Sequence, residues 1–315
     1  MELISIDQTR VDAEYRDEMC RKLEQGNILL LNPTPFIPSE EDCAFLRAQR
    51  QTTRPSHKNI AYKPHLDKIT GADAENTQDA DRLHTILSNY SLGAMKTLAK
   101  MFPVYAEVWR VDYASFRPVE EQGRDLPLRH RNDLMHLDAF PTRPTHGGRI
   151  LRAFTNIHPE RDRVWGVSDS FPIIAERYAN LAGLKEVTSP FSNFRRGAFR
   201  AGKLVGLKIP DRSAYDEFML KFHHYLKANE EFQLNGQTQT AAFPPGSTWI
   251  SFTDQVAHKA LSGQYALEQT CIVPLRCHLL PEEAPVNVLE RIAGKKLISA
   301  NPPAISGETS GRVHA

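Results

Sequence analysis

The residues best suited to chemistry are a histidine and an aspartate two positions apart, joined far along the chain by a second histidine. His136 and Asp138 lie in the apolar stretch 130–138, which we expect to be a strand, and His258 follows a second expected strand at 247–253. Residues two apart on a strand share a face, so both side chains can reach one metal ion. Two histidines and one carboxylate form the facial triad of non-haem Fe(II) oxygenases, which leaves coordination positions open. We therefore expect His136, Asp138 and His258 to be metal ligands and catalytic residues.

A His-x-Asp triplet alone is a weak signal, because the chain contains a second copy at His65-Leu66-Asp67. That copy follows Pro64 in a polar stretch without strand character, so no metal is expected there. Zinc hydrolases also use two histidines and a carboxylate, but they usually carry a nearby general base that no motif supplies here. The turn, strand and distal histidine at 244–258 repeat the layout of double-stranded β-helix oxygenases. This combination favours iron with 2-oxoglutarate.

The elements that must position these residues form a β-rich α+β pattern. Alternating or continuously apolar stretches predict further strands at 3–6, 27–32, 104–116, 149–157, 256–261 and 265–275. Helical spacing and capping residues predict helices at 11–24, from Ser39 onward, at 75–101 and at about 285–297. The sequence predicts one domain over 1–300 with a double-stranded β-helix (jelly-roll, cupin-like) core, flanking helices and a helical insertion at about 158–240. Residues 301–315 are expected to be a disordered tail.

Composition limits the class of protein. The chain has 315 residues, 41% of them hydrophobic, and a net charge of +1, which favours no nucleic-acid partner. Its four cysteines form no CxxC pair and suit reduced thiols in a cytoplasm. The N-terminus lacks the pattern of a signal peptide, and no stretch approaches the ~20 apolar residues of a spanning helix. We expect a soluble, cytoplasmic protein that is still able to touch a membrane surface.

The run from His136 to Arg152 (HLDAFPTRPTHGGRILR) resembles the Kdo hydroxylases, which act on 3-deoxy-D-manno-oct-2-ulosonic acid in lipopolysaccharide. The resemblance continues through FTNI at 154–157, returns in DQVAH at 254–258 and EQT at 268–270, and covers about residues 25–280. It implies an Fe(II) enzyme that uses 2-oxoglutarate and O2 to hydroxylate C3 of the Kdo sugar of a lipid A precursor. The implied products are the Ko sugar, succinate and CO2. The lipid-linked substrate would bring the protein to the inner face of the bacterial inner membrane.

The distal carboxylate of 2-oxoglutarate needs a cation, ideally a bidentate arginine. Many relatives in the wider superfamily place it about eleven residues after the distal histidine, where this chain has Gln269. We expect Arg152 to replace it from the neighbouring strand, with Asn156 and Gln269 hydrogen bonding nearby. Arg276 is the alternative, although strand parity turns it to the opposite face unless a bulge intervenes.

An anionic saccharide should be bound by cations with hydroxyl and amide partners. Three segments offer such groups, with the floor of the site formed by His130 and Asn132. The expected substrate contacts are His57, Lys58 and Asn59; Thr142, Arg143, His146 and Arg149; and Arg195, Arg196 and Arg200. The first and third segments could instead be solvated surface, and the third could rest on lipid headgroups.

Three other functions stay open at this point. A 2-oxoglutarate-dependent hydroxylase of another small acid or sugar would keep the triad without these basic loops. A non-catalytic cupin-like carbohydrate-binding protein would release no succinate. A metal-dependent isomerase or hydrolase would use the same ligands for different chemistry.

Overall fold

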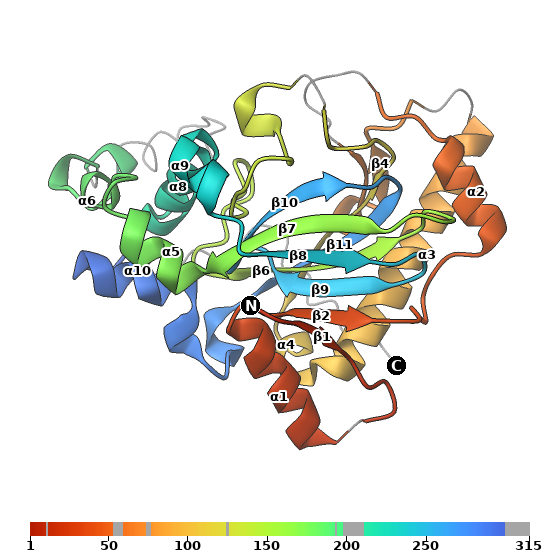
Figure 1. The fold of residues 1–315 in the computed structure, drawn as a ribbon, viewed down its shortest axis with the longest axis horizontal. Helices are drawn as coiled ribbons and strands as arrows, with labels where there is room; N and C mark the ends of the chain where they lie inside the picture. The colour runs from red at the N-terminus through yellow and green to blue at the C-terminus, as the bar shows by residue number, and fades with distance from the viewer. Residues whose placement is uncertain are drawn as a thin grey trace.

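Two β-sheets form the centre of the protein. The computed structural model describes residues 1–10, 12–52, 59–73, 77–123, 126–192, 194–197 and 211–299. The larger sheet has the order β1 (Leu3–Ser5), β2 (Ile28–Leu31), β9 (Thr248–Phe252), β6 (Arg149–Asn156), β11 (Ala266–Val273), β5 (Arg110–Arg117), β3 (Ile60–Lys63) and β4 (Lys68–Thr70). The smaller sheet has the order β10 (Val256–Ser262), β7 (Arg163–Ser170) and β8 (Gln239–Phe243). The expected jelly-roll core with flanking helices is confirmed (Figure 1).

Aromatic side chains fill part of the space between the two sheets. Phe154 and Trp249 of the larger sheet pack against Trp165 and Phe243 of the smaller one. The Phe243 and Trp249 rings stack with their centroids 4.1 Å apart, and Phe154 stacks on Trp249 at 5.3 Å. These large, well-packed rings fix the spacing of the sheets at the place where the site begins.

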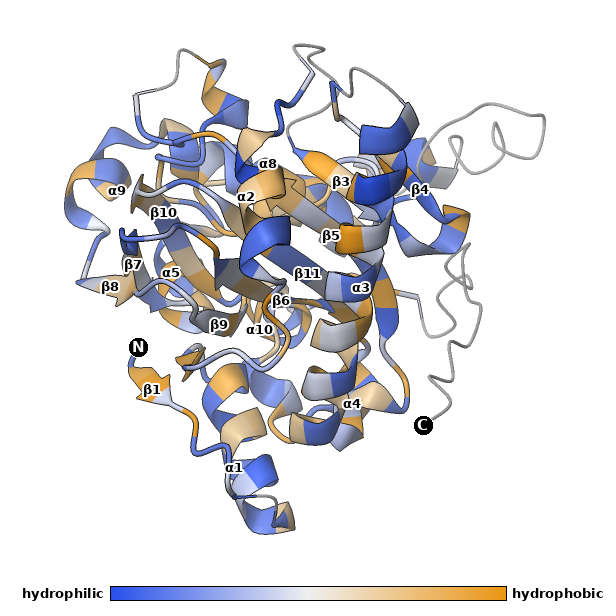
Figure 2. Ribbon diagram, turned by 90° about the vertical axis from the view of Figure 1, so that its right-hand side faces the viewer, coloured by the Kyte–Doolittle hydropathy of each residue, from blue (hydrophilic) through white to orange (hydrophobic). Residues whose placement is uncertain are grey.

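Helices cover the outer face of the larger sheet. The helices α1 (Ala13–Glu24), α3 (Thr77–Met101) and α4 (Pro103–Ala106) bury apolar residues against Leu151, Ile250 and Phe252. Helix α2 (Glu40–Ala48) packs near β3 and is capped by the Ser39 side chain, which accepts from the Asp42 N–H. Hydrophilic and hydrophobic residues both occur on α1 and α3, as amphipathic surface helices require (Figure 2). Strands β6 and β11 are therefore buried on both faces.

A helical lobe lies at one end of the strands. It consists of α5 (Phe171–Tyr178), α6 (Leu184–Val187), α8 (Ala214–Ala228), α9 (Glu230–Asn235) and α10 (Pro285–Ala293), gathered at the left of Figure 1. Its core includes Phe171, Phe222 and Leu289, and it extends to Met135 and Leu137 beside the expected metal ligands. The lobe therefore packs directly on the ligand segment.

The structure corrects three of the expected elements. The stretch 158–240 is not wholly helical, because it contains β7 and the start of β8 of the smaller sheet. The stretch 104–116 begins as helix α4, since Pro103 suits the first turn of a helix, and becomes strand β5 only at Arg110. Residues 130–138 form no regular strand. They follow a short 3-10 turn at Leu128–His130 and join β10 through a single bridge.

The other predicted helices and strands agree within a few residues. The last helix ends early, at Ala293, because Gly294 adopts a left-handed conformation that terminates it. The tail at 301–315 lies outside the described residues. None of the helices in the described part of the chain combines the length and the hydropathy needed to cross a membrane.

Candidate active site

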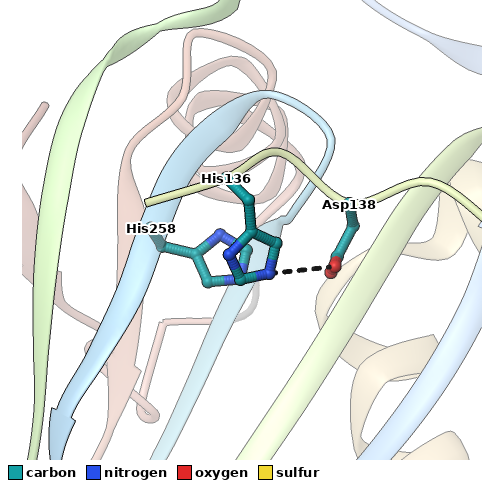
Figure 3. A group of neighbouring side chains, drawn as sticks. All are labelled: His136, Asp138 and His258. Carbon is teal, nitrogen blue, oxygen red and sulfur yellow. Dashed lines mark ion pairs between the residues drawn. The ribbon is translucent and has the colours of Figure 1, made fainter. Parts of the chain in front are cut away.

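The three expected ligands converge. His136, Asp138 and His258 are all buried, and one potential ligand atom from each lies within 4.8 Å of the others. Figure 3 shows the two imidazoles and the carboxylate turned toward one another, with 3.7 Å between His136 Nε2 and Asp138 Oδ1. It is the one such group of possible metal ligands within the described ranges. The residues that the sequence singled out therefore meet in space.

Backbone hydrogen bonds place the two histidines opposite each other. The His136 N–H donates to the His258 carbonyl at 3.1 Å, and the His258 N–H donates back to the His136 carbonyl at 2.9 Å. Farther along, the Asp138 N–H donates to the Thr253 carbonyl at 2.9 Å. Strand β10 therefore supplies one ligand and aligns the irregular segment that supplies the other two.

Side chains from the helical lobe hold the same irregular segment from its other side. Gln233 accepts from the Met135 N–H at 2.8 Å and donates to the Met135 carbonyl at 2.9 Å. His223 Nδ1 lies 2.6 Å from the Leu137 carbonyl, and its ring meets His136 edge-on with centroids 5.1 Å apart. The hydrogen bonds fall on residues next to His136 and Asp138, and the ring contact falls on His136 itself. The lobe thus replaces the neighbouring strand that this segment lacks.

Both ligand histidines present Nε2 to the centre of the site. His136 Nδ1 lies 2.7 Å from the Leu134 carbonyl and His258 Nδ1 lies 2.9 Å from the Val256 carbonyl. A carbonyl oxygen only accepts, so Nδ1 carries the proton and Nε2 keeps its lone pair. Burial lowers the pKa of both His136 and His258, which keeps the rings neutral. Neutral imidazoles with fixed tautomers are suited to bind a metal.

Asp138 is held as a carboxylate. Burial alone would raise the pKa of Asp138, but the guanidinium of Arg152 holds it well below its usual range. Arg152 Nη1 lies 2.9 Å from Asp138 Oδ2, although no donor is well aligned with that oxygen, so the contact is mainly a charge pair. Two neutral nitrogens and one carboxylate oxygen fit divalent iron with open coordination positions.

A cavity opens beside the ligands. Its walls bring three guanidinium groups close to the centre, together with aromatic and polar side chains. The lining residues are Arg117, Asn132, His136, Asp138, Arg152, Phe154, Arg163, Trp165, His258 and Ala260. Arg152 and Asn132 are among the residues expected from the sequence, whereas Arg117 and Arg163 are not.

The three arginines differ in how their charge is balanced. Arg117 pairs with Glu268 at 2.6 Å, and Arg152 Nε lies 3.3 Å from the same carboxylate. Arg163 is 2% exposed, donates to the Gly263 carbonyl at 2.9 Å and has an unpartnered Nε. Burial lowers the pKa of Arg163 to about 10. Within the described residues, Arg163 is thus a buried cation without a direct carboxylate partner.

The structure places the other expected cosubstrate residues outside the cavity. Asn156 donates to the carbonyls of Arg161 and Phe243, so it ties the loop before β7 to the end of β8. Gln269 bonds to Ser91 of α3 at 2.7 Å, on the outer face of the sheet, since its neighbour Glu268 points inward. Arg276 follows Pro274, which comes directly after the end of β11, and is exposed in a short 3-10 turn.

The expected substrate residues at 142–149 separate into different environments. Thr142 is exposed and Arg143 half-buried, whereas His146 turns toward Asp216, with 3.6 Å between His146 Nδ1 and Asp216 Oδ2. Arg149 is 0% exposed and lies over Phe252 on the outer, helix-covered face, 4.1 Å from the ring centroid. The expectation for Arg149 is therefore wrong, because three positions along β6 separate it from the inward-facing Arg152.

The remaining expected contacts lie elsewhere. Arg195 and Arg196 both pair with Glu217 of α8, and Arg196 also donates to the Val187 carbonyl at 2.9 Å. Asn59 is half-buried just before β3, and His130 ends the short 3-10 turn at Leu128–His130. None of these four side chains lines the cavity. His57, Lys58 and Arg200 lie outside the described residues.

Comparisons with known proteins agree with this geometry. A model of the 3-deoxy-D-manno-oct-2-ulosonic acid (Kdo) hydroxylase family matches residues 6–296. The chain belongs to the Kdo hydroxylase family. A search of curated proteins gave no match.

Solved structures of the Kdo hydroxylase KdoO, a non-heme Fe(II) alphaketoglutarate dependent dioxygenase, resemble this family member over nearly its full length. The complex with alphaketoglutarate and Fe(III) has 33% identity and a TM-score of 0.80, covering 96% of this chain and 99% of KdoO. The apo structure has 32% identity, a TM-score of 0.81 and the same coverage. The complex with succinate and Fe(III) has 33% identity and a TM-score of 0.78, covering 95% of this chain and 98% of KdoO. These matches confirm the family expected from the sequence.

Proposed function

We propose that this chain is an Fe(II)- and 2-oxoglutarate-dependent hydroxylase that acts at C3 of the Kdo sugar of a lipid A precursor. The observation that carries the proposal is the buried set of His136, Asp138 and His258 opening onto an arginine-lined cavity. Membership of the Kdo hydroxylase family supports the same reaction. The product would be the Ko sugar, with succinate and CO2 from the cosubstrate.

Iron would be held by Nε2 of His136, Nε2 of His258 and a carboxylate oxygen of Asp138. When bound, it supplies the activation of O2 that couples 2-oxoglutarate decarboxylation to hydroxylation of the sugar. The chain keeps both imidazoles neutral and the carboxylate ionised, so no proton has to leave before the metal enters. Arg152 balances the charge of Asp138 and fixes its orientation.

The distal carboxylate of 2-oxoglutarate is best matched by Arg163. Arg117 and Arg152 already share Glu268, and Arg152 also contacts the metal ligand Asp138. Arg163 faces the same cavity as a buried charge with an unused N–H. Bringing a carboxylate to a buried, under-satisfied guanidinium recovers the energy that its desolvation costs. We therefore assign Arg163 to the distal carboxylate and Arg152 to the metal end of the cavity.

The lipid-linked substrate also suggests where the protein works. Phe191 and Phe194 are 74% and 76% exposed, and Arg195 follows directly, 44% exposed at its side chain. Exposed aromatic rings beside a cation suit the headgroup region of an anionic membrane. This supports a cytoplasmic protein in peripheral contact with the inner face of the inner membrane.

The decisive experiment supplies purified protein with Fe(II) under anaerobic conditions, then 2-oxoglutarate, Kdo-lipid A and O2. Mass spectrometry should find one added oxygen on the Kdo sugar and an equal amount of succinate. Succinate without an oxidised Kdo sugar would point instead to another acid or sugar as the acceptor. Retention of the oxidised product by His136→Ala would refute the metal assignment.

A further inference from the structure

A row of cations and aromatic rings leads from the metal ligands toward the surface. The Arg152 guanidinium lies 5.4 Å from the centroid of the Phe140 ring, and the Arg143 guanidinium lies 4.3 Å from the same ring. Arg143 also lies over Tyr113 at 4.0 Å, so it is sandwiched between two rings. Its Nη1 is 2.5 Å from both oxygens of Asp112, which fixes the guanidinium in place. The row is therefore continuous and rigid from Asp138 outward.

The outer end of the row is formed by β3 and the turn after it. Lys63 Nζ lies 5.2 Å from the Tyr113 ring, and His65 stacks on Tyr113 with centroids 5.9 Å apart. Lys63 is half-buried and His65 is exposed. Neither has an ion pair with another described residue, in contrast to Arg143. The charge of Lys63 is thus left uncompensated at the rim.

The second His-x-Asp triplet explains how this rim keeps its shape. Asp67 adopts a left-handed conformation, φ 47°, and accepts from the Tyr62 hydroxyl at 2.9 Å. His84 of α3 lies 2.7 Å from the same carboxylate oxygen. These contacts fasten the turn that carries His65 and direct Asp67 away from Tyr113. The triplet therefore holds the His65 ring in position, and the Asp67 carboxylate bonds to Tyr62 and His84.

We propose that Lys63, His65 and Arg143 form a rim subsite for an oxyanion of the saccharide, a carboxylate or a phosphate, other than the group nearest the metal. The row passes through two rings and two guanidinium groups between Asp138 and Lys63, so one sugar carboxylate cannot serve both ends. Cations already fixed by ring stacking lose little freedom when an anion binds, which strengthens binding. This inference rests on the proposed function, because it takes the substrate to be a saccharide with several anionic groups.

The test measures the affinity of the iron-loaded protein for Kdo-lipid A without O2. Lys63→Ala and Arg143→Ala should each weaken binding by roughly tenfold, as expected for the loss of a charge-assisted contact. Lys96→Ala is the matched control, since Lys96 is an exposed lysine on α3, which covers the outer face of the sheet, and its affinity should equal that of the wild type. Thermal unfolding of each variant checks that the fold is intact, and His65→Ala provides a milder variant should Arg143→Ala be unstable.

Two further ligands identify the anion. If the rim binds phosphate, dephosphorylated Kdo-lipid A should bind equally to wild type and Lys63→Ala; if it binds a carboxylate, the difference should persist. Free Kdo is too small to reach the rim from the metal and should not distinguish the two proteins. Wild-type affinity of both Lys63→Ala and Arg143→Ala for the complete substrate would overturn the inference. A wild-type protein that neither binds nor oxidises Kdo-lipid A would instead refute the proposed function.

Discussion

The two halves of the metal centre are built differently. His258 lies on strand β10, which pairs with β7 over Val256–Ser262, with shifts in register near both ends. His136 and Asp138 lie on an irregular segment that joins β10 at one bridge, makes single backbone bonds to Thr253 and Ala260, and is held on its other side by Gln233 and His223 of the helical lobe. A sheet fixes a side chain through many shared bonds, whereas the irregular segment depends on a few. The sheet half should therefore tolerate substitutions around its ligand, and the lobe half should not.

The largest effect should follow removal of a ligand from either half. His258→Ala and His136→Ala should both lose iron binding, because a facial triad has only three protein ligands. The loss should exceed the ~100-fold penalty typical of removing an outer hydrogen bond to a ligand. Calorimetric titration with Fe(II) or Co(II) under anaerobic conditions measures it. Near wild-type affinity in either variant would show that the ion is held elsewhere.

The side of the site formed by β10 and its neighbour β7 should also bind the cosubstrate, through Arg163. Arg163→Ala should raise the dissociation constant of 2-oxoglutarate by roughly 10- to 100-fold, the value of a charged hydrogen bond, and should leave iron affinity nearly unchanged. Arg161→Ala is the charge-matched control, since Arg161 is exposed two residues earlier. The opposite result, with loss of binding in Arg152→Ala alone, would return the distal carboxylate to Arg152.

The lobe half should respond to a change that touches no ligand. Gln233→Ala removes both side-chain bonds to Met135 and should weaken metal binding by about tenfold. Gln233→Glu keeps the acceptor for the Met135 N–H and should lose less metal affinity than Gln233→Ala. Gln122→Ala, at an exposed turn, is the control for the loss of a glutamine. Equal metal affinity in Gln233→Ala and Gln122→Ala would mean that the sheet alone positions the segment.

The smallest effect concerns pH. Burial, with the nearby charge of Lys227, lowers the pKa of His223 to about 3. The unfolded chain takes up this proton near the ordinary histidine pKa of about 6.5, so the folded state loses stability as pH falls from there toward 3. Between pH 7 and 5, His223 should lower the free energy of unfolding by roughly 2 kcal/mol. His223→Gln should therefore reduce the dependence of the free energy of unfolding on pH. Urea unfolding of the metal-free protein measures it, and an unchanged slope would contradict the prediction.

The sequence predicts the three clustered residues His136, Asp138 and His258 better than the residues that surround and position them. The convergence of His136, Asp138 and His258 was predictable because strand-like context, the turn and strand before His258 and the long run to Arg152 set this triplet apart from the copy at 65–67. Arg163 is not indicated by the sequence, because β7 lies in the stretch 158–240, whose clearest signals are helical. Arg149 and Gln269 were placed wrongly because β6 and β11 are buried on both faces. On such strands hydrophobicity does not reveal which side chains point inward.

Irregular structure was the other limit. Asn156 shares the inward parity of Arg152, but its amide donates to the carbonyl of Arg161 in the loop before β7 and to that of Phe243 at the end of β8. The local sequence does not predict such a tertiary contact. The same holds for Gln233, because its hydrogen-bond partner Met135 lies about a hundred residues earlier in the chain.

Backbone hydrogen bonds hold His136 and His258 side by side although they lie far apart in the sequence, and this has a consequence for folding. An ion bound by both side chains closes a loop of 258 − 136 = 122 residues, much as a disulfide would. The ion dissociates when the chain unfolds, so it stabilises the protein by binding the folded state alone, by roughly 2.7 kcal/mol when free metal stands at about a hundred times the dissociation constant. Unlike a disulfide, this crosslink is reversible and its strength varies with the concentration of free metal. Iron supply would then set both the activity of the protein and how long each molecule stays folded.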